Sequence, residues 1–556
     1  MGFKGKKRYL AVAAAGLLAA GTLFVAAENP DFRLGRNMEI LANLMREVNT
    51  FYVEPVDADK LLENGAYGML SELDPYTSFI PESEMEDFEL LTTGKYGGVG
   101  SIIRPKGDWV YIAEPYKDSP ADRAGLGIGD RIVEIDGRSM KGATTSDVSS
   151  SLKGDPGTEV RVKVAKFGTG EEREFTIKRE RIAIPGVPYH GFIAEGIGYI
   201  QHSEFTEDCS NDMRKALMEL KETGQLKALV LDYRGNGGGI LQEAVKILSL
   251  FVPKGTEVVS MRGRSERSSS VFTTDTEPVD TEIPIVVLVG SGTASAAEIV
   301  AGALQDLDRA VIVGHRTYGK GLVQSTRPVG YNAYLKVTTA KYYIPSGRCI
   351  QAVDYARRNP DGSVASVPDS LAKEFRTAGG RKVYDGGGIT PDLAFEPEYV
   401  SRFTIITYGK GYIQDFGDLY ALENHPVPEP GVFRLSDADY GRFVGFMADK
   451  DVEYRSETSV ALEQLRTNAG RERYLERIEE ALKQIEQGLK DDKESNLMLY
   501  RDQLTELIEE DIILRHHYRE GVTRHILTRD KDAGRAARLA GNREEYDALL
   551  RPAGGL

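Results

Sequence analysis

The sequence predicts a multidomain α/β protein that has an inserted mostly-β module and a C-terminal helical region. Three changes of pattern along the 556 residues support this prediction. Between residues 181 and 398, buried apolar runs alternate with glycine loops and with helical spacing, which is typical of α/β folds. Between residues 82 and 180, short alternating strands are separated by glycine turns. After residue 399, glycine is sparse, charge is dense, and apolar residues recur at helical spacing.

Length, charge and cysteine content limit the possible classes of protein. A chain of 556 residues is long enough for three or four domains. The net charge of −15 disfavours a nucleic-acid partner. Cys209 and Cys349 match no metal-binding pattern and form no disulfide framework, and the sequence leaves open whether they pair.

The N-terminus has the layout of a targeting segment. Cationic residues at positions 4, 6, 7 and 8 precede an uncharged, mostly apolar run over residues 9–27. The run is also long enough to remain as a membrane anchor. We therefore expect residues 1–28 to be a signal peptide or an N-terminal anchor, and the chain to be exported. A buried core helix is the less favoured alternative, because the cations lie immediately before the run.

Residues 29–81 have the spacing of an N-terminal helical segment. The pattern predicts two helices, and Asp74-Pro75 then breaks it. The apolar positions that carry the helical spacing are Ile40, Leu41, Leu44, Met45, Val48, Leu61, Leu62, Tyr67 and Leu70.

The module at residues 82–180 contains three glycine-containing segments, at residues 96–103, 119–126 and 129–137, followed by a short predicted helix at residues 147–152. This order resembles a PDZ domain. The resemblance implies that the N–H groups of Gly98, Val99 and Gly100 hold the terminal carboxylate of a peptide. It also implies that Ser101, Ile102 and Ile103 pair with the peptide backbone by strand addition. The alternative is that these glycines only form a tight turn.

Ser295 is the candidate nucleophile. It follows an apolar predicted strand, Ile285 to Val289, and a glycine-containing turn, and it precedes an apolar helical run. A serine at a helix N-terminus lies beside free N–H groups and the positive end of the helix dipole, which favour developing negative charge. The alternative reading is structural, because Ser295 and Glu298 also form the capping-box pattern S-x-x-E.

Lys320 is the candidate base for this serine. A serine hydroxyl is a weak nucleophile until a base takes its proton, and a lysine can do so only when it is neutral. Burial lowers the pKa of a lysine, and Leu322 and Val323 can exclude water beside Lys320. Gln324 can orient the amine through its neutral carbonyl, whereas a carboxylate would keep the lysine charged.

A glycine-rich loop follows the predicted strand at residues 228–231. The loop, Asp232 to Gly239, does not fit a dinucleotide-binding fingerprint, because position 240 is Ile240 where glycine is required. Its N–H groups can instead receive an oxyanion, with the N–H of Ala296 as a second donor. A purely structural turn stays open as an alternative.

These motifs, in this order, resemble the C-terminal processing (tail-specific) peptidase family. The resemblance spans about residues 61–392 and includes the motifs at residues 232–239, 290–298 and 319–324. It implies an endopeptidase core at residues 181–398, with Ser295 as nucleophile, Lys320 as general base and Gln324 as its orienting partner. It also implies an oxyanion hole formed by the N–H groups of Gly238 and Ala296. Family members commonly have proline at the position of Gly237, so which glycine donates is open.

A histidine base is the alternative chemistry. His190, His202 and His315 are candidates by residue type, but none lies in a recognised triad motif. A catalytically inactive, exported PDZ scaffold is the alternative function, although a binding scaffold needs no set of serine, lysine and glutamine.

Residues 399–556 are predicted to form a C-terminal helical domain. Leu475, Ile478, Leu482, Ile485 and Leu489 form a heptad-like stripe, and the theme repeats at residues 497–507. We expect the two stripes to pair as a hairpin within one chain. Pairing with a second subunit is the alternative, and the family resemblance keeps homo-oligomerisation through terminal helices open.

The expected activity is cleavage of polypeptides that bind the PDZ module by their C-termini. The expected mechanism is acyl transfer to Ser295, which needs no metal and no organic cofactor. We expect no nucleic-acid partner and membrane contact only through the N-terminal segment. The expected location is the bacterial periplasm or the outer face of the inner membrane.

Overall fold

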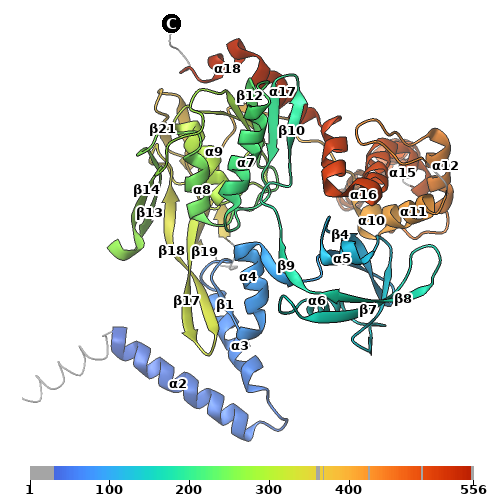
Figure 1. Cartoon of the computed structure of the whole chain (residues 1–556), viewed down its shortest axis with the longest axis horizontal. Coiled ribbons are helices and arrows are strands. Elements are labelled where there is room, and N and C mark those ends of the chain that lie inside the picture. Colours follow the sequence, from blue (N-terminus) through green and yellow to red (C-terminus); the bar gives the residue numbers. More distant parts are fainter. Residues whose placement is uncertain (1–29, 359–363, 367, 424–425, 490–491, 553–556) are drawn as a thin grey trace, which may run out of the picture. The chain divides into compact units, whose positions relative to one another are not determined.

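The structure is a computed structural model that describes residues 30–552, apart from residues 359–363, 367, 424–425 and 490–491 (Figure 1). The predicted targeting segment at residues 1–28 lies outside the described residues. None of the helices in the described part is long and apolar enough to cross a membrane. The described residues divide into two compact units, and the first comprises residues 30–85 and 324–338.

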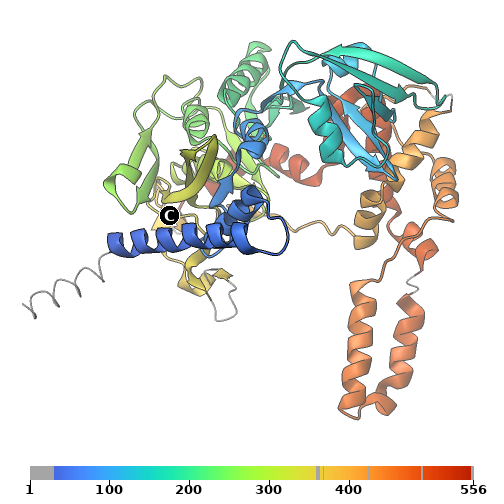
Figure 2. The same ribbon diagram turned by 90° about the horizontal axis from the view of Figure 1, so that it is seen from below.

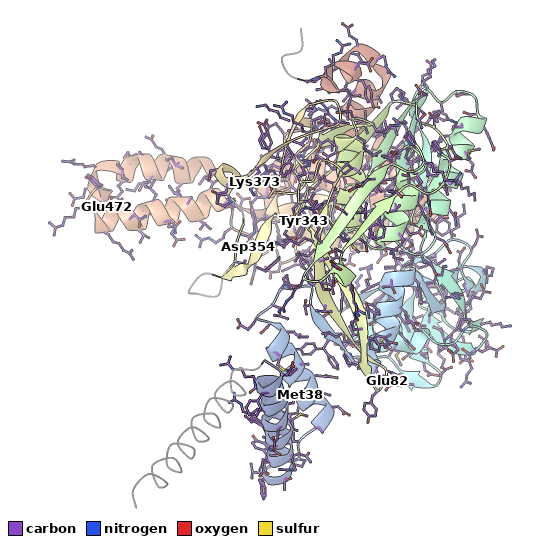
Figure 3. All side chains as sticks on the ribbon, turned by 90° about the vertical axis from the view of Figure 1, so that its left-hand side faces the viewer. Met38, Glu82, Tyr343, Asp354, Lys373 and Glu472 are labelled. Carbon is purple, nitrogen blue, oxygen red and sulfur yellow. The ribbon has the colours of Figure 1, made fainter. Side chains whose placement is uncertain are left out.

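The first unit contains the N-terminal helical segment. Two helices and a turn are present, as the spacing predicts. Asp57 caps the second helix, and the Asp74 carboxylate accepts the N–H groups of Tyr76 and Thr77, which closes the predicted turn. Figure 3 labels Met38 on the first helix. The elements are α2 (Pro30–Phe51), α3 (Ala58–Leu70), β1 (Ser78–Ile80) and η1 (Glu82–Glu84), and β1 pairs with residues 334–336 of β18 (Ala333–Tyr343).

The second unit begins at residue 86, within α4 (Met85–Thr93), and continues into the PDZ module. The chain enters the module through β2 (Lys95–Gly98) and leaves it through β9 (Glu180–Ala183), and these two strands pair antiparallel as a ribbon. The module's sheet has the order β3-β4-β5-β7-β8, so β3 is an edge strand among the described strands. The other elements of the module are β3 (Ser101–Lys106), β4 (Trp109–Pro115), α5 (Pro120–Ala124), β5 (Arg131–Ile135), β6 (Arg138–Ser139), α6 (Thr145–Leu152), β7 (Glu159–Ala165) and β8 (Glu172–Lys178).

The α/β core at residues 181–398 is built on a six-stranded sheet of order β10-β11-β12-β15-β16-β23. The strands from β11 to β23 are parallel, and only β10 is antiparallel to its neighbour. Parallel strands are buried on both faces, which explains their continuous apolar runs. The strands are β10 (Tyr189–Ala194), β11 (Ile197–Gln201), β12 (Ala228–Asp232), β15 (Ile285–Val289), β16 (Val311–Gly314) and β23 (Leu393–Ala394).

Helices cover both faces of this sheet (Figure 1). On β15, alternate residues contribute to different apolar clusters: Val287 lies in the cluster of α7, α8 and α9, and Val286 lies in the cluster of α17 and α18. The last two helices of the described residues are therefore part of the packing of the α/β core. The covering helices are α7 (Cys209–Glu222), α8 (Leu241–Leu248), α9 (Ala296–Asp306), α17 (Lys531–Gly541) and α18 (Arg543–Leu549).

Smaller sheets complete the core. Residues 340–343 of β18 pair with β13 (Glu257–Gly263), which pairs with β14 (Ser270–Thr273). Cys209 and Cys349 are both free thiols, so they do not pair with each other. The remaining strands are β17 (Leu322–Gly330), β19 (Val353–Arg358), β20 (Val364–Ser366), β21 (Glu374–Arg376) and β22 (Lys382–Tyr384).

The C-terminal helical region confirms the predicted fold class but corrects one pairing. The leucine stripe lies on α14 and packs against α13, and the two helices form an antiparallel pair (Figure 2) whose turn carries Glu472 (Figure 3). The second stripe belongs to a different cluster, which contains Leu497 and Leu504. The helices are α10 (Arg402–Gly409), α11 (Tyr412–Ala421), α12 (Asp437–Phe446), α13 (Glu457–Arg471), α14 (Leu475–Leu489), α15 (Lys493–Leu499) and α16 (Arg501–Leu527).

Candidate active site

Ser295 lies where the chain turns from β15 into α9, as the strand-turn-helix pattern predicts. The serine is buried, with 6% of its surface exposed, and it has a left-handed backbone with φ of 56°. Such a conformation costs a non-glycine residue about 1–3 kcal/mol and persists only where the surrounding structure enforces it. We call residues 290–295 the serine turn.

Lys320 lies in the loop between β16 and β17, and we call residues 315–321 the lysine turn. The lysine is half-buried, and Leu322 and Val323 beside it are buried, as predicted for a site that excludes water. Gly319 has a left-handed backbone with φ of 85°, and a Cβ atom there would lie 2.4 Å from Cβ of Ala352. The flanking glycine is therefore needed for close packing.

The carboxylate of Glu298 joins the two turns. Its Oε2 accepts the N–H of Ser295 at 2.9 Å and the N–H of Lys320 at 2.8 Å. Burial raises the pKa of this carboxyl, and its hydrogen bonds offset part of that rise. The capping-box pattern is thus real, but the glutamate also contacts the lysine turn, which local sequence does not reveal.

Gln324 lies on β17 in the first unit, four residues after Lys320. Its Nε2 donates to Oγ1 of Thr338 at 3.2 Å. Its assignment as the partner that orients Lys320 stays a prediction.

The glycine loop approaches the serine closely. Gly238 has φ of 92°, and a Cβ atom there would lie 2.6 Å from the carbonyl oxygen of Ala294 and 2.8 Å from the nitrogen of Ala296. Ala296 is the first residue of α9, where N–H groups have no acceptor within the helix. The structure therefore brings both predicted oxyanion donors next to Ser295.

The N–H of Gly238 has a partner within its own loop. It donates to Oδ1 of Asn236 at 2.8 Å, while Nδ2 of Asn236 donates to the carbonyl of His202 at 2.8 Å. The carbonyl of the same asparagine accepts the N–H of Ala294 at 2.9 Å. The buried Asn236 therefore ties the glycine loop to the serine turn, and Gly238 must leave Oδ1 of Asn236 before its N–H can bind an oxyanion.

The other charged residues of this motif have structural partners. The guanidinium of Arg234 donates to the Asp232 carboxylate at 2.6 Å and to the Asp530 carboxylate at 2.5 Å. The hydroxyl of Tyr199 also donates to Asp232, at 2.7 Å. This ion cluster connects the start of the glycine loop to the start of α17.

Tyr342 is a neighbour of Ser295 that the sequence analysis missed. The side chain is buried on β18, and burial raises the pKa of Tyr342 to about 12, while a side-chain hydrogen bond with Ser295 offsets part of that rise. A tyrosine 47 positions from the serine gives no local signal, because only the pairing of distant strands brings it there.

The three histidines have other surroundings. His202 packs edge-on against the rings of Phe205 and Tyr233. Burial lowers the pKa of His202 to about 3, which keeps its ring neutral. His190 contacts Glu219 of α7 at 2.7 Å, and the N–H of His315 donates to the carbonyl of Val289. None of these contacts involves Ser295.

The predicted peptide-binding residues lie at the start of the PDZ sheet. Gly98 ends β2, Val99 and Gly100 form the connecting loop, and Ser101 to Ile103 begin the edge strand β3. The carbonyl of Val99 accepts the N–H of Ala121 at 2.8 Å, which fixes the loop against α5. An edge strand preceded by a fixed loop is the arrangement that strand addition requires.

Family profiles match parts of the core, of the PDZ module and of the helical region. A profile of peptidase family S41 matches residues 196–364, and a PDZ profile matches residues 111–166. A profile described as the C-terminal helical domain of a probable PDZ-protease matches residues 404–540.

Named relatives point in the same direction. A carboxy-terminal-processing protease of Bartonella bacilliformis is 36% identical over 346 residues, which make up 61% of this chain and 79% of that protein. A probable CtpA-like serine protease of Staphylococcus aureus (strain N315) is 34% identical over 316 residues, or 56% of this chain and 62% of that protein. Among solved structures, the photosystem II D1 C-terminal processing protease is 28% identical, with a TM-score of 0.36, over 64% of this chain and 87% of that chain. With 36% identity across most of a carboxy-terminal-processing protease, this chain belongs to that family of S41 peptidases and is a serine protease with a PDZ domain.

Proposed function

We propose that this protease cleaves polypeptides by acyl transfer to Ser295, with Lys320 as the general base. The observation that carries the proposal is the shared acceptor: the main-chain N–H groups of both residues donate to Oε2 of Glu298. One atom therefore holds the serine turn beside the lysine turn. Burial of Leu322 and Val323 supports a neutral amine, because exclusion of water disfavours the ammonium form.

In the proposed reaction, Nζ of Lys320 takes the proton from Oγ of Ser295 as Oγ attacks the scissile carbonyl. The tetrahedral oxyanion binds the N–H groups of Gly238 and Ala296, and removal of one such donor costs roughly 10²- to 10³-fold in rate. The C–N bond then breaks, and the lysine returns its proton to the leaving amine. Water, activated by the same amine, hydrolyses the acyl-enzyme. Gln324 is proposed to orient the lysine.

The PDZ module is proposed to supply selectivity by binding the C-terminal tail of the substrate. The edge position of β3 and the fixed loop at Gly98 to Gly100 support this assignment. The N–H groups of the loop would hold the terminal carboxylate. Blocking that carboxylate as an amide should therefore raise KM more than it lowers kcat.

Several properties of the whole protein are also proposals. We propose export to the periplasm or to the outer face of the inner membrane, because residues 1–28 have the layout of a targeting segment. Homo-oligomerisation through terminal helices stays a prediction. Besides the substrate and water, the proposed steps involve only side chains and main-chain N–H groups of this chain.

Cleavage of a peptide with a free C-terminus by the parent and four variants tests the mechanism. Ser295→Ala and Lys320→Ala should each lower kcat by at least about 10³-fold. Ser291→Ala, in the same turn but exposed, and Lys341→Ala, an exposed lysine on β18, are matched controls and should retain the parent rate. Parent-like turnover by either of the first two variants would reject the proposed pair and favour the binding scaffold.

The pH dependence tests the lysine separately. The ordinary pKa of lysine is about 10.4, and burial lowers it. Since only the neutral amine is a base, kcat should rise through an apparent pKa well below 10. A rising limb at about 10 would show a lysine that is not desolvated.

A further inference from the structure

Glu298 has an unusual set of hydrogen bonds for a helix-capping residue. It lies in the first turn of α9 with none of its surface exposed. Its Oε1 accepts the hydroxyl of Thr317 at 2.5 Å and the N–H of Gly319 at 2.7 Å. Its Oε2 accepts the N–H groups of Ser295 and Lys320, at 2.9 and 2.8 Å. A simple capping box would require only the bond to the serine N–H.

The hydrogen bonds of this side chain connect it to both turns. A carboxylate has about four acceptor positions, and here four donor groups lie within hydrogen-bond distance of its two oxygens. The hydroxyl of Thr317 also accepts the N–H of Ile389 at 2.6 Å. Burial raises the pKa of Glu298 and these bonds offset part of that rise, so the contacts themselves are what couple this carboxyl to the serine and lysine turns.

We propose that Glu298 is a positioning residue that sets the distance and orientation between the nucleophile and its base. Three of its four bonds go to the lysine turn and the fourth goes to the serine itself, so loss of the carboxylate uncouples the two turns. This inference rests on the proposed acyl-transfer function. Misplacement of a reacting group by about 1 Å costs on the order of 10²-fold in rate.

Replacement of Glu298 by glutamine is the first test. A glutamine has the same shape but only one oxygen, and its NH₂ group would face two of the donors. We expect kcat of Glu298→Gln to fall by about 10²-fold while KM changes by less than about threefold. Labelling of Ser295 by a serine-reactive fluorophosphonate should slow by a similar factor, because it reports nucleophile activation without substrate binding.

A second pair of variants leaves the carboxyl group of Glu298 in place. Thr317→Val removes one donor to Glu298 and keeps the side-chain shape, whereas Thr317→Ser retains the hydroxyl. We expect Thr317→Val to lower kcat by about tenfold, since loss of one hydrogen bond to a charged group is of that order. Thr317→Ser should restore most of that activity. A residue that only caps a helix would not give this contrast.

Glu243→Gln is the matched control for loss of a buried carboxylate. Glu243 is 3% exposed on α8, and its carboxylate accepts the N–H of Ser210 at 3.0 Å, away from both turns. It should keep the parent kcat even if its melting temperature falls.

The outcomes separate this inference from the proposed function. Complete loss of turnover and labelling in Ser295→Ala supports the nucleophile, whatever the result at Glu298. A kcat within threefold of the parent in Glu298→Gln overturns the positioning role. If Glu298→Gln does not fold, equal kcat values in Thr317→Val and Thr317→Ser overturn it instead.

Discussion

Gly238 approaches Ser295, the proposed nucleophile, so closely that the position has no room for a side chain. A Cβ atom there would lie 2.6 Å from a carbonyl oxygen and 2.7 Å from Cβ of Ser295, and its φ of 92° disfavours other residues. We expect Gly238→Ala to lower kcat/KM by at least about 10²-fold, because the loop must move away from the oxyanion.

The neighbouring glycine is the matched control for this prediction. A Cβ atom at Gly237 would meet no atom within 4 Å. Gly237→Ala should therefore stay within about threefold of the parent kcat/KM. Equal activity of the two alanine variants would show that the close approach of Gly238 is unimportant for catalysis.

His202 should make the protein sensitive to acid. Burial lowers the pKa of His202 from 6.5 to about 3. Below pH 6.5 the unfolded chain binds a proton that the folded chain refuses, so stability falls as the pH falls towards 3. Between pH 6.5 and pH 3, this histidine lowers the free energy of unfolding by about 1.4 kcal/mol for each unit that the pH falls.

Replacement of His202 by glutamine should weaken the dependence of stability on pH between pH 6.5 and pH 4. Denaturant unfolding at several pH values measures the slope of the free energy of unfolding against pH. Tyr233→Phe is the control. It removes a neighbouring hydroxyl and keeps the His202 ring, so it should keep the slope of the parent. An unchanged slope in His202→Gln would assign the acid sensitivity to other groups.

Single residues of the site differ in how far the sequence could predict them. Ser295 and Lys320 were singled out by local signals, a strand-turn-helix pattern and flanking glycines, and the family resemblance then supplied their expected roles, which stay predictions. Glu298 was recognisable only as a cap, since its partners in the lysine turn lie about twenty positions away. Tyr342 and the bond from Gly238 to Asn236 depend on tertiary packing, so no periodicity could indicate them.

At the scale of elements, helix α11 packs against α16 through a glycine. A Cβ atom at Gly417 would lie 1.8 Å from Oδ2 of Asp511, which is paired with Arg515 at 2.8 Å. Gly417→Ala should therefore lower the free energy of unfolding of the helical region by about 1–3 kcal/mol. Thermal unfolding of the full chain, followed by far-UV circular dichroism, measures this.

Gly441, in the middle of α12, provides the matched comparison. A Cβ atom there would meet no atom within 4 Å. Gly441→Ala should raise stability by up to about 1 kcal/mol, because alanine has the higher helix propensity. A loss of stability in both variants would mean that backbone effects, rather than the clash with Asp511, dominate at position 417.

The elements themselves were largely predictable, but their partners were not. The strands β12 and β15 follow from their apolar runs, and α14 follows from the stripe at Leu475 to Leu489. A stripe shows which face of a helix is buried and not which helix buries it. The prediction therefore chose residues 497–507 as the partner, whereas the helix that contacts α14 is α13.

At the scale of the whole molecule, the C-terminal helices are needed to cover the catalytic sheet. Ala536 and Ala540 of α17 are buried against the same cluster as Val286 and Leu288 of β15. The hydroxyl of Tyr546 in α18 accepts the N–H of Ile285 at 3.1 Å. The charged terminal segment therefore has an apolar face that local composition conceals.

Ala536→Asp should yield insoluble or inactive protein, because it buries an unpaired charge against the sheet that carries Ser295. Arg538→Asp, two positions later on the exposed side of the same helix, should leave solubility and activity close to the parent. Soluble yield and kcat/KM measure both variants. A soluble, active Ala536→Asp protein would show that the core tolerates loss of this layer.

The pairing of β2 with β9 determines how the PDZ module is joined to its host. Lys95 lies opposite Ala183 and Gly98 lies opposite Glu180, so the insertion starts and finishes at adjacent points of the backbone. An insertion with adjoining ends can be exchanged for another of different size without stretching the surrounding chain. A module held by adjoining ends can therefore gain or lose residues without straining the backbone on either side of it.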